Sequence, residues 1–266
     1  MATLLWLQTG ACSGDTMSLL TADSPPVETL VRNGTLDILW HPSLSATPPG
    51  GLGQLIAAIE AGTQTLDILC VEGSLITGPF GTGMFDSYRG RPKIQIAEAL
   101  ARRARYVVAV GTCSAFGGIP AAPPNPTDCT GLQFHREQPG GMLPPEWRSA
   151  AGLPVINLAG CPTHPNTIVR SLAMIAQGLP LDLDFLNRPR AFYGSTVHQG
   201  CTRNEYHEYN LEETQLGGLQ TFVTPAQASD SDPAAQRRKV SWKQLFKALI
   251  LNPDFGKRIE SASDFN

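Results

Sequence analysis

Short apolar runs alternate with amphipathic stretches along the first two-thirds of the chain. Continuous apolar runs of four to eight residues are typical of strands in a parallel sheet that is covered on both faces. Five such runs lie near Gly or Pro residues that would end them. They cover residues 3–8, 36–40, 66–71, 106–111 and 154–159. The pattern therefore predicts five parallel strands.

The stretches between these runs have a helical period. Residues 53–61, 93–104 and 165–177 place apolar side chains three and four positions apart. Strands that alternate with helices imply right-handed βαβ units and an open, doubly wound parallel sheet. We therefore predict an α/β fold.

Two further segments bear on domain organisation. The Pro- and Gly-rich stretch 118–152 is too long for an ordinary connection, so we expect it to be functional or packed against a partner. A boundary is expected near residue 185, which gives a first domain at 1–185 and a short, irregular, partly helical region at 186–266.

An apolar stripe follows a polar linker near the C-terminal end. We expect it to form an amphipathic helix that packs on its own domain or on a partner subunit, with contact to a membrane surface as the alternative. The stripe consists of Trp242, Leu245, Phe246, Leu249 and Ile250.

Composition narrows the functional classes. The 42% hydrophobic content is sufficient for a core, and the net charge of −3 with no nucleic-acid motif argues against a nucleic-acid partner. The first residues have neither a basic segment nor a long apolar segment, and no run approaches the roughly 20 apolar residues of a membrane span. We therefore expect a cytoplasmic protein, in which six cysteines are metal ligands or buried side chains before they are disulfides.

Three cysteines lie in glycine-flanked turns directly after predicted strands. They are Cys12, Cys113 and Cys161. In an open parallel sheet, ligands bind beyond the carboxyl ends of the strands, so these thiols are expected at one edge. Thiolates are soft ligands, suited to an iron–sulfur cluster or a zinc ion. A single cysteine is more often a small buried side chain, but three in equivalent turns favour a shared site.

Two acidic residues belong to the same predicted edge. Asp15 lies three positions after Cys12, where a CxxC pair has its second sulfur, and Glu72 follows the third strand. Asp15 has two interpretations, an iron ligand through oxygen or a helix N-cap, and we favour the ligand. Cys70, inside a strand, is expected in the core, and Cys129, in the long stretch, is expected to be structural.

At these motifs the chain resembles the small subunit of nickel–iron hydrogenases, over roughly residues 3–215. The matching segments are WLQTGACSGDTMSLL, VEGSLITGPFGTG, GTCSAFGGIP, GCPTHP and STVHQGCTRNEYHEYN. The wording is most similar to the cytoplasmic uptake and high-affinity branch. The resemblance implies a flavodoxin-like first domain and a large-subunit partner that carries the nickel–iron centre.

The resemblance also implies roles for individual residues. Cys12, Cys113 and Cys161 match three ligands of a proximal [4Fe-4S] cluster, and Asp15 falls on the fourth position, usually Cys but not in every member of this branch. Glu72 matches an acidic residue near the subunit interface, with a role in proton movement or docking, or else as a hydrogen-bonded loop carboxylate.

The C-terminal part departs from the family pattern. His198 and Cys201 match the start of a second cluster region, but no cysteine follows Cys201. Two ligands cannot hold a [4Fe-4S] cluster, which takes four. We therefore expect one proximal cluster, with His198 and Cys201 as weak candidates for a second site.

The expected function is electron transfer from hydrogen oxidation, with an unknown acceptor and no hydrogen splitting by this chain alone. Two alternatives stay open: a hydrogen-sensing regulatory hydrogenase subunit, and a cluster-free remnant or assembly partner. A quinone-linked subunit of the respiratory complex I type is disfavoured, because that family usually has two adjacent cysteines where this chain has only Cys12.

Overall fold

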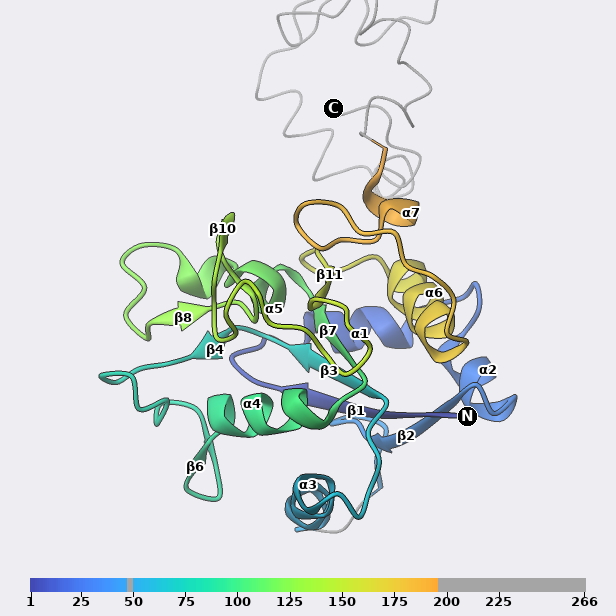
Figure 1. The fold of residues 1–266 in the computed structure, drawn as a ribbon, viewed down its shortest axis with the longest axis horizontal. Helices are drawn as coiled ribbons and strands as arrows, with labels where there is room; N and C mark the ends of the chain where they lie inside the picture. The colour runs from blue at the N-terminus through green and yellow to red at the C-terminus, as the bar shows by residue number, and fades with distance from the viewer. Residues whose placement is uncertain (47–49, 196–266) are drawn as a thin grey trace, which may run out of the picture. The chain divides into compact units, whose positions relative to one another are not determined.

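A five-stranded parallel sheet forms the centre of the computed structural model, which describes residues 1–46 and 50–195. The strand order is β11-β7-β3-β1-β2, shown in Figure 1. Numbered along the sheet, this is the 2-1-3-4-5 order of flavodoxin-like folds. The strands are β1 (Ala2–Gln8), β2 (Leu36–Trp40), β3 (Ile68–Glu72), β7 (Tyr106–Val110) and β11 (Ile156–Leu158).

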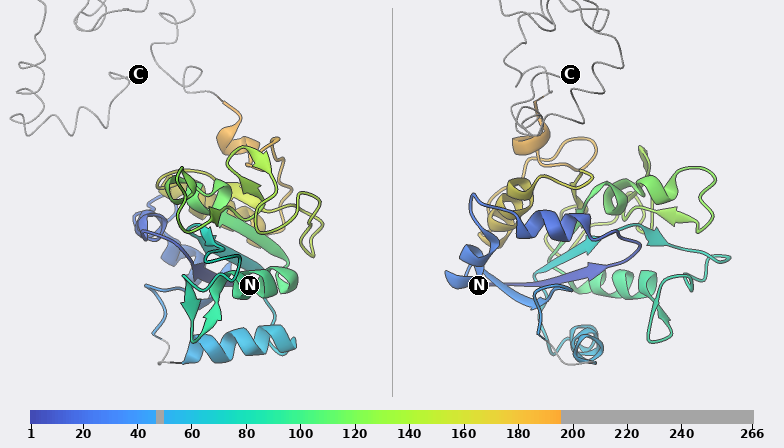
Figure 2. Two further views of the ribbon diagram at one scale, coloured as in Figure 1. Left: turned by 90° about the vertical axis from the view of Figure 1, so that its left-hand side faces the viewer. Right: turned by 180° about the vertical axis from the view of Figure 1, so that it is seen from behind.

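Helices cover both faces of the sheet, as the two views of Figure 2 show. One face carries α1 (Gly14–Leu20), α2 (Val27–Arg32) and α6 (Pro165–Ala176). The other carries α3 (Gly51–Ala61), α4 (Lys93–Arg103) and the short α5 (Thr112–Phe116). The doubly wound α/β fold expected from the apolar runs is therefore confirmed.

The strand β1 shows why these runs are continuously apolar. Successive strand side chains point to opposite faces. Leu5 and Leu7 enter the core under α3 and α4, whereas Leu4 and Trp6 enter the core under α1 and α6. Because both faces are covered, no position of the strand centre is left for a polar residue.

The long stretch 118–152 packs on its own domain. It contains the 3₁₀ helix η1 (Ile119–Ala121) and the short strands β8 (Cys129–Thr130), β9 (Phe134–His135) and β10 (Gln138–Pro139). Gln133 is 1% exposed and donates to the carbonyls of Pro144, Pro145 and Trp147. These bonds fold the stretch onto itself, and whether it also contacts a partner stays a prediction.

The remaining short elements frame this core. They are β4 (Leu75–Ile76), which pairs with β8, the β5–β6 pair (Ser87–Tyr88 and Arg91–Pro92), and α7 (Arg190–Tyr193). Residues Met1–Gly194 form one compact unit. The domain boundary expected near residue 185 stays a prediction. His198, Cys201 and the Trp242–Ile250 stripe lie outside the described residues. None of the helices in the described ranges is long and apolar enough to cross a membrane.

Candidate functional site

The three predicted ligand cysteines lie in turns beyond the carboxyl ends of their strands. Cys12 is in the loop between β1 and α1, Cys113 is in the first turn of α5 after β7, and Cys161 follows β11. The Cys12 and Cys161 side chains are exposed, and Cys113 is half-buried. The first turn borders the β1/β3 position at which the strand order reverses, the usual ligand position in this topology.

Backbone hydrogen bonds join the second and third turns. The Gly111 N–H donates to the Leu158 carbonyl at 2.9 Å, and the Thr112 N–H donates to the Gly160 carbonyl at 2.8 Å. In return, the Gly160 N–H donates to Thr112 Oγ1 at 3.1 Å. Thr112 and Gly160 directly precede Cys113 and Cys161, so these bonds hold the two cysteine turns together.

Asp15 joins the first turn to the other two. Its Oδ1 accepts the Thr163 N–H at 2.8 Å, and its Oδ2 lies 2.0 Å from the position that a Cβ on Gly111 would occupy. Gly111 has φ +89°, a conformation that favours glycine. The pKa of Asp15 is raised, mainly by burial and further by the charge of Glu72. The hydrogen bonds from Thr163 lower it in part.

The N-cap interpretation of Asp15 is wrong. The N-cap of α1 is Ser13, and Asp15 lies inside the first turn of the helix with its carboxylate directed to Thr163 and Gly111. Ligation of iron by Asp15 stays a prediction.

The Cys113 sulfur is enclosed by the turn that follows α5. A Cβ on Gly118, which has φ +57°, would lie 2.7 Å from Cys113 Sγ. Burial raises the pKa of the Cys113 thiol, the Ser74 side chain lowers it, and the thiols of Cys161 and Cys12 raise it again. Cys12 and Cys161 are thus each close enough to Cys113 to affect its thiol electrostatically.

The donor set fits a cluster better than a single ion. Among residues 1–46 and 50–195, no three His, Cys, Asp or Glu side chains converge closely enough to hold one metal ion. A [4Fe-4S] cluster takes its four protein ligands at four different irons, so they surround a larger volume. Three thiols on linked turns with an adjacent carboxylate supply the number of donors that such a cluster takes, and thiolates are the soft ligands that iron–sulfur clusters prefer.

Glu72 is buried inside the chain and accepts four hydrogen bonds. It is 1% exposed, at the end of β3. Trp6 Nε1 and Gln8 Nε2 donate to it at 2.9 and 3.1 Å, and Thr16 donates through both its backbone N–H and its hydroxyl. Glu72 therefore fixes α1 against β1 and β3. A further role in proton movement or docking stays a prediction.

His41 is a buried residue to which the sequence interpretation assigned no role. It is 0% exposed, and its ring lies 5.1 Å from that of Trp6. Nδ1 accepts the Ser43 N–H at 3.1 Å, and Nε2 has no hydrogen-bond partner within the described part of the chain. Burial lowers the pKa of His41 to about 4, against a smaller opposing effect of Glu72.

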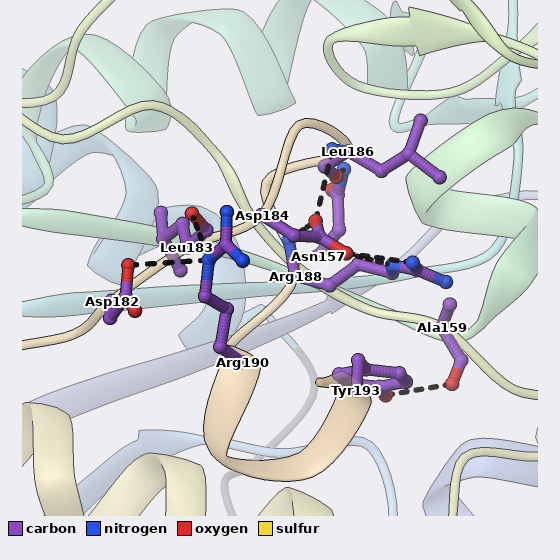
Figure 3. Close-up of polar contacts among 9 residues, drawn as sticks. All are labelled: Asn157, Ala159, Asp182, Leu183, Asp184, Leu186, Arg188, Arg190 and Tyr193. Carbon is purple, nitrogen blue, oxygen red and sulfur yellow. Dashed lines mark hydrogen bonds and ion pairs between the residues drawn. The ribbon is translucent and has the colours of Figure 1, made fainter. Parts of the chain in front are cut away.

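A polar clamp on the third cysteine turn was also missed by sequence reasoning (Figure 3). The Tyr193 hydroxyl donates to the Ala159 carbonyl at 2.8 Å, two residues before Cys161. The Arg188 guanidinium lies over the Tyr193 ring at 5.3 Å and pairs with Asp184 at 2.7 Å. Burial acts to raise the pKa of Asp184, but the hydrogen bonds from Arg188 outweigh it and lower that pKa. Burial raises the pKa of Tyr193. The only sequence signal for this clamp is the Arg-Pro-Arg segment at residues 188–190.

The two other described cysteines lie where the sequence predicted. Cys70 is fully buried in β3, and this burial raises the pKa of its thiol. Cys129 is 2% exposed, and its Sγ lies 3.0 Å from Thr127 Oγ1. Both thiols are therefore buried in the fold, as expected.

The chain matches one protein family over most of the described fold. Residues 12–175 match the family described as NADH ubiquinone oxidoreductase, 20 Kd subunit. The chain belongs to this family. The matched range includes all four candidate ligands, Cys12, Asp15, Cys113 and Cys161.

Several of its relatives are hydrogenase small subunits. The F420 non-reducing hydrogenase II small subunit of Methanosarcina mazei is 30% identical over 240 residues, covering 81% of this chain and 61% of that protein. The Hydrogenase-2 small chain of Escherichia coli K12 is 32% identical over 221 residues, covering 80% of this chain and 53% of that protein. The family-level resemblance inferred from the motifs is confirmed.

A solved structure supports the same relation. The actinobacterial-type NiFe-hydrogenase from Ralstonia eutropha H16 matches with a TM-score of 0.71 and 29% identity, over 82% of this chain and 66% of that chain. The present chain spans less than two-thirds of the length of the two relatives above. Activity, cofactor and partners of the whole protein are therefore matters of proposal.

Proposed function

We propose that this chain is the electron-transfer small subunit of a [NiFe] hydrogenase and pairs with a large subunit that carries the nickel–iron centre. The two relatives named above are hydrogenase small subunits, and a solved NiFe-hydrogenase chain shares this fold. Electrons released by hydrogen oxidation in the large subunit would enter this chain. The chain alone would not split hydrogen.

One observation supports the electron-transfer role above the others. Three cysteine turns at one edge of the sheet are joined to each other, through Gly111 and Thr112 on one side and Asp15 and Thr163 on the other. Cys12, Cys113, Cys161 and Asp15 would hold a single [4Fe-4S] cluster. When bound, such a cluster supplies a one-electron store.

The chain's own residues have separate tasks in this proposal. Gly118 leaves room for the Cys113 sulfur, and the half-buried position of Cys113 limits the access of water to it. The hydrogen bond from Thr163 fixes Oδ1 of Asp15. Oδ2 keeps lone pairs for an iron, since a carboxylate has two oxygens that accept.

Several finer points stay predictions. They are membership of the uptake and high-affinity branch, the cytoplasmic location, a second site at His198 and Cys201, and the identity of the electron acceptor.

The test is an iron and acid-labile sulfide determination with an electron paramagnetic resonance spectrum. The chain is prepared without oxygen, together with its large subunit. We expect about four irons per chain, because one [4Fe-4S] cluster contains four. A count near eight would instead support a second cluster at His198 and Cys201. An iron-free protein that still binds the large subunit would contradict the electron-transfer proposal and favour a remnant or assembly partner.

A further inference from the structure

The two edges of the central sheet differ in how the chain covers them. At the β11 edge, the segment after α6 lies along the strand: the Asn157 N–H donates to the Asn187 carbonyl at 2.9 Å, and Asn157 Nδ2 donates to the Leu186 carbonyl at 2.8 Å. β2 is the last strand on the other side (Figure 1). Among residues 1–46 and 50–195, β2 forms no hydrogen bond beyond its pairing with β1. This second edge therefore presents unpaired backbone groups.

An apolar groove of about 740 Å³ lies beside the β2 edge. It is lined by residues of α2, of β2 and of the loop that follows β2. Two of its apolar side chains are largely exposed, Val31 at 42% and Leu44 at 43%. Exposed apolar surface next to an unpaired strand edge is typical of an interaction surface, because both features are unfavourable to leave in water.

Opposite charges lie along the α2 side of this groove. Glu28 is in the first turn of α2 and Arg32 is in its last turn, and both residues are exposed. A Glu and an Arg four positions apart on a helix usually pair with each other. In the described part of the chain, however, neither forms an ion pair, and neither does Asp37, the third charged residue of the groove. The described residues thus provide no partner for these charges.

We propose that this β2 edge surface is an interface between two copies of the chain. A two-fold axis makes the two β2 strands antiparallel, so that one sheet continues across both copies. Because a turn at 33–35 joins α2 to β2, the two α2 helices are then antiparallel as well. Glu28 of each copy faces Arg32 of the other, and Val31 and Leu44 are covered. A surface that carries both members of an ion pair is self-complementary, as a two-fold interface requires.

This pairing leaves the cysteine turns accessible. The turns lie beyond the carboxyl ends of the strands, and antiparallel β2 strands direct those ends of the two sheets to opposite sides. Each copy therefore keeps its own cysteine edge for the large subunit of the proposed function. The inference does not require a bound cluster, so it stands or fails separately from the electron-transfer proposal.

The experiment is sedimentation velocity of the full chain, alone and with its large subunit, over a range of concentrations. We expect two copies of the chain per particle. Glu28→Arg and Arg32→Glu should each raise the dissociation constant of the dimer about tenfold or more, because like charges then meet at two contacts. The double variant Glu28→Arg with Arg32→Glu should restore the dimer, since opposite charges face each other again. Rescue of this kind is specific to the proposed pairing.

The chain offers a matched control on another helix. Glu98 and Arg102 have the same spacing on α4 but pair with each other. Glu98→Arg should therefore leave the particle mass unchanged. Hydrogen–deuterium exchange tests the strand pairing: the amides of residues 36–40 should exchange more slowly where the dimer forms than at high dilution. The amides of residues 156–158 should not change, because their edge is already covered.

Four results would overturn the inference. The first is one copy per particle at every concentration. The second is a dimer that the single charge reversals do not weaken, or that the double variant does not restore. The third is slower exchange at residues 36–40 on binding of the large subunit alone, which would assign the surface to that subunit. The fourth is a monomer that retains a bound apolar small molecule, which would make the groove a ligand site.

Discussion

Asp15 and Thr163 are 148 residues apart in the chain, and Asp15 Oδ1 accepts a hydrogen bond from the Thr163 N–H at 2.8 Å. This bond joins the first turn of α1 to the turn that contains Cys161. The same carboxylate lies over Gly111, two residues before Cys113. One buried side chain therefore holds the three cysteine turns in a common arrangement.

Gly111→Ala should disrupt this arrangement. A Cβ at Gly111 would collide with Asp15 Oδ2 at 2.0 Å, and the residue has φ +89° and ψ 154°, a region that is nearly restricted to glycine. We expect a loss of about 2 kcal/mol or more in the free energy of unfolding, measured by urea denaturation. Gly152→Ala is the control, since Gly152 has φ +76° but no atom within 4 Å of the added Cβ. An equal loss in both variants would mean that backbone strain alone is responsible.

Asp15→Cys tests whether Asp15 is a ligand. A fourth thiolate in place of a carboxylate should leave a cluster bound but change its reduction potential and spectrum, because sulfur is the softer ligand. Asp15→Asn separates ligation from packing, since its Oδ1 still accepts the Thr163 N–H while its amide is a poor iron ligand. A potential and spectrum that are the same in all three proteins would reject ligation by Asp15.

The sheet was predictable from the sequence because its strands are covered on both faces. Runs such as 106–111 are apolar at every position for that reason, and the structure ends this strand at Val110. The three cysteine turns followed from the rule that parallel strands end at one edge. Contacts such as Asp15 with Thr163 were not predictable, because they join loops distant in sequence with no periodic signal.

The burial of polar residues was likewise beyond sequence reasoning. Glu72 is the last residue of β3 and His41 follows β2, positions at which a side chain can be either solvent-facing or enclosed. Only the fold shows that Trp6, Gln8 and Thr16 surround Glu72. Tyr193 had no motif, and its role depends on the path of residues 182–193 back to Ala159.

Glu72→Gln should destabilise the described fold. Both carboxylate oxygens accept hydrogen bonds, so an amide NH₂ on either side would face a donor from Trp6 or Thr16. We expect a loss of about 2 kcal/mol in unfolding free energy, since a buried donor left without an acceptor costs about 1–3 kcal/mol. Glu146→Gln, at an exposed position, is the control and should change little. If Glu72→Gln were equally stable, the four bonds would not be essential to the fold.

Tyr193→Phe tests the clamp on the third cysteine turn. The variant keeps the ring under Arg188 and removes only the hydroxyl that bonds the Ala159 carbonyl. We expect a loss of about 1 kcal/mol, the net contribution of one hydrogen bond, in urea denaturation. Tyr88→Phe, whose ring also lies under an arginine, is the control. The clamp would be refuted by a Tyr193→Phe protein as stable as the unmodified one, with unchanged reactivity of the Cys161 thiol.

His41 should make the stability of the fold depend on pH below neutrality. Its pKa in the folded chain is about 4, below the usual 6.5, because burial disfavours the charged ring. Between these values the unfolded chain binds a proton that the folded chain does not, so stability is complete above pH 6.5 and falls as the pH drops toward 4. The shift of about 2.5 units corresponds to about 3 kcal/mol at most. Urea denaturation from pH 7.5 to 4 should show this fall in the free energy of unfolding. His41→Gln should make the pH dependence flatter. His164→Gln, at an exposed position, is the control and should leave the pH dependence as it is. The same slope in all three proteins would assign the pH dependence to other groups, since only His41→Gln removes the buried imidazole.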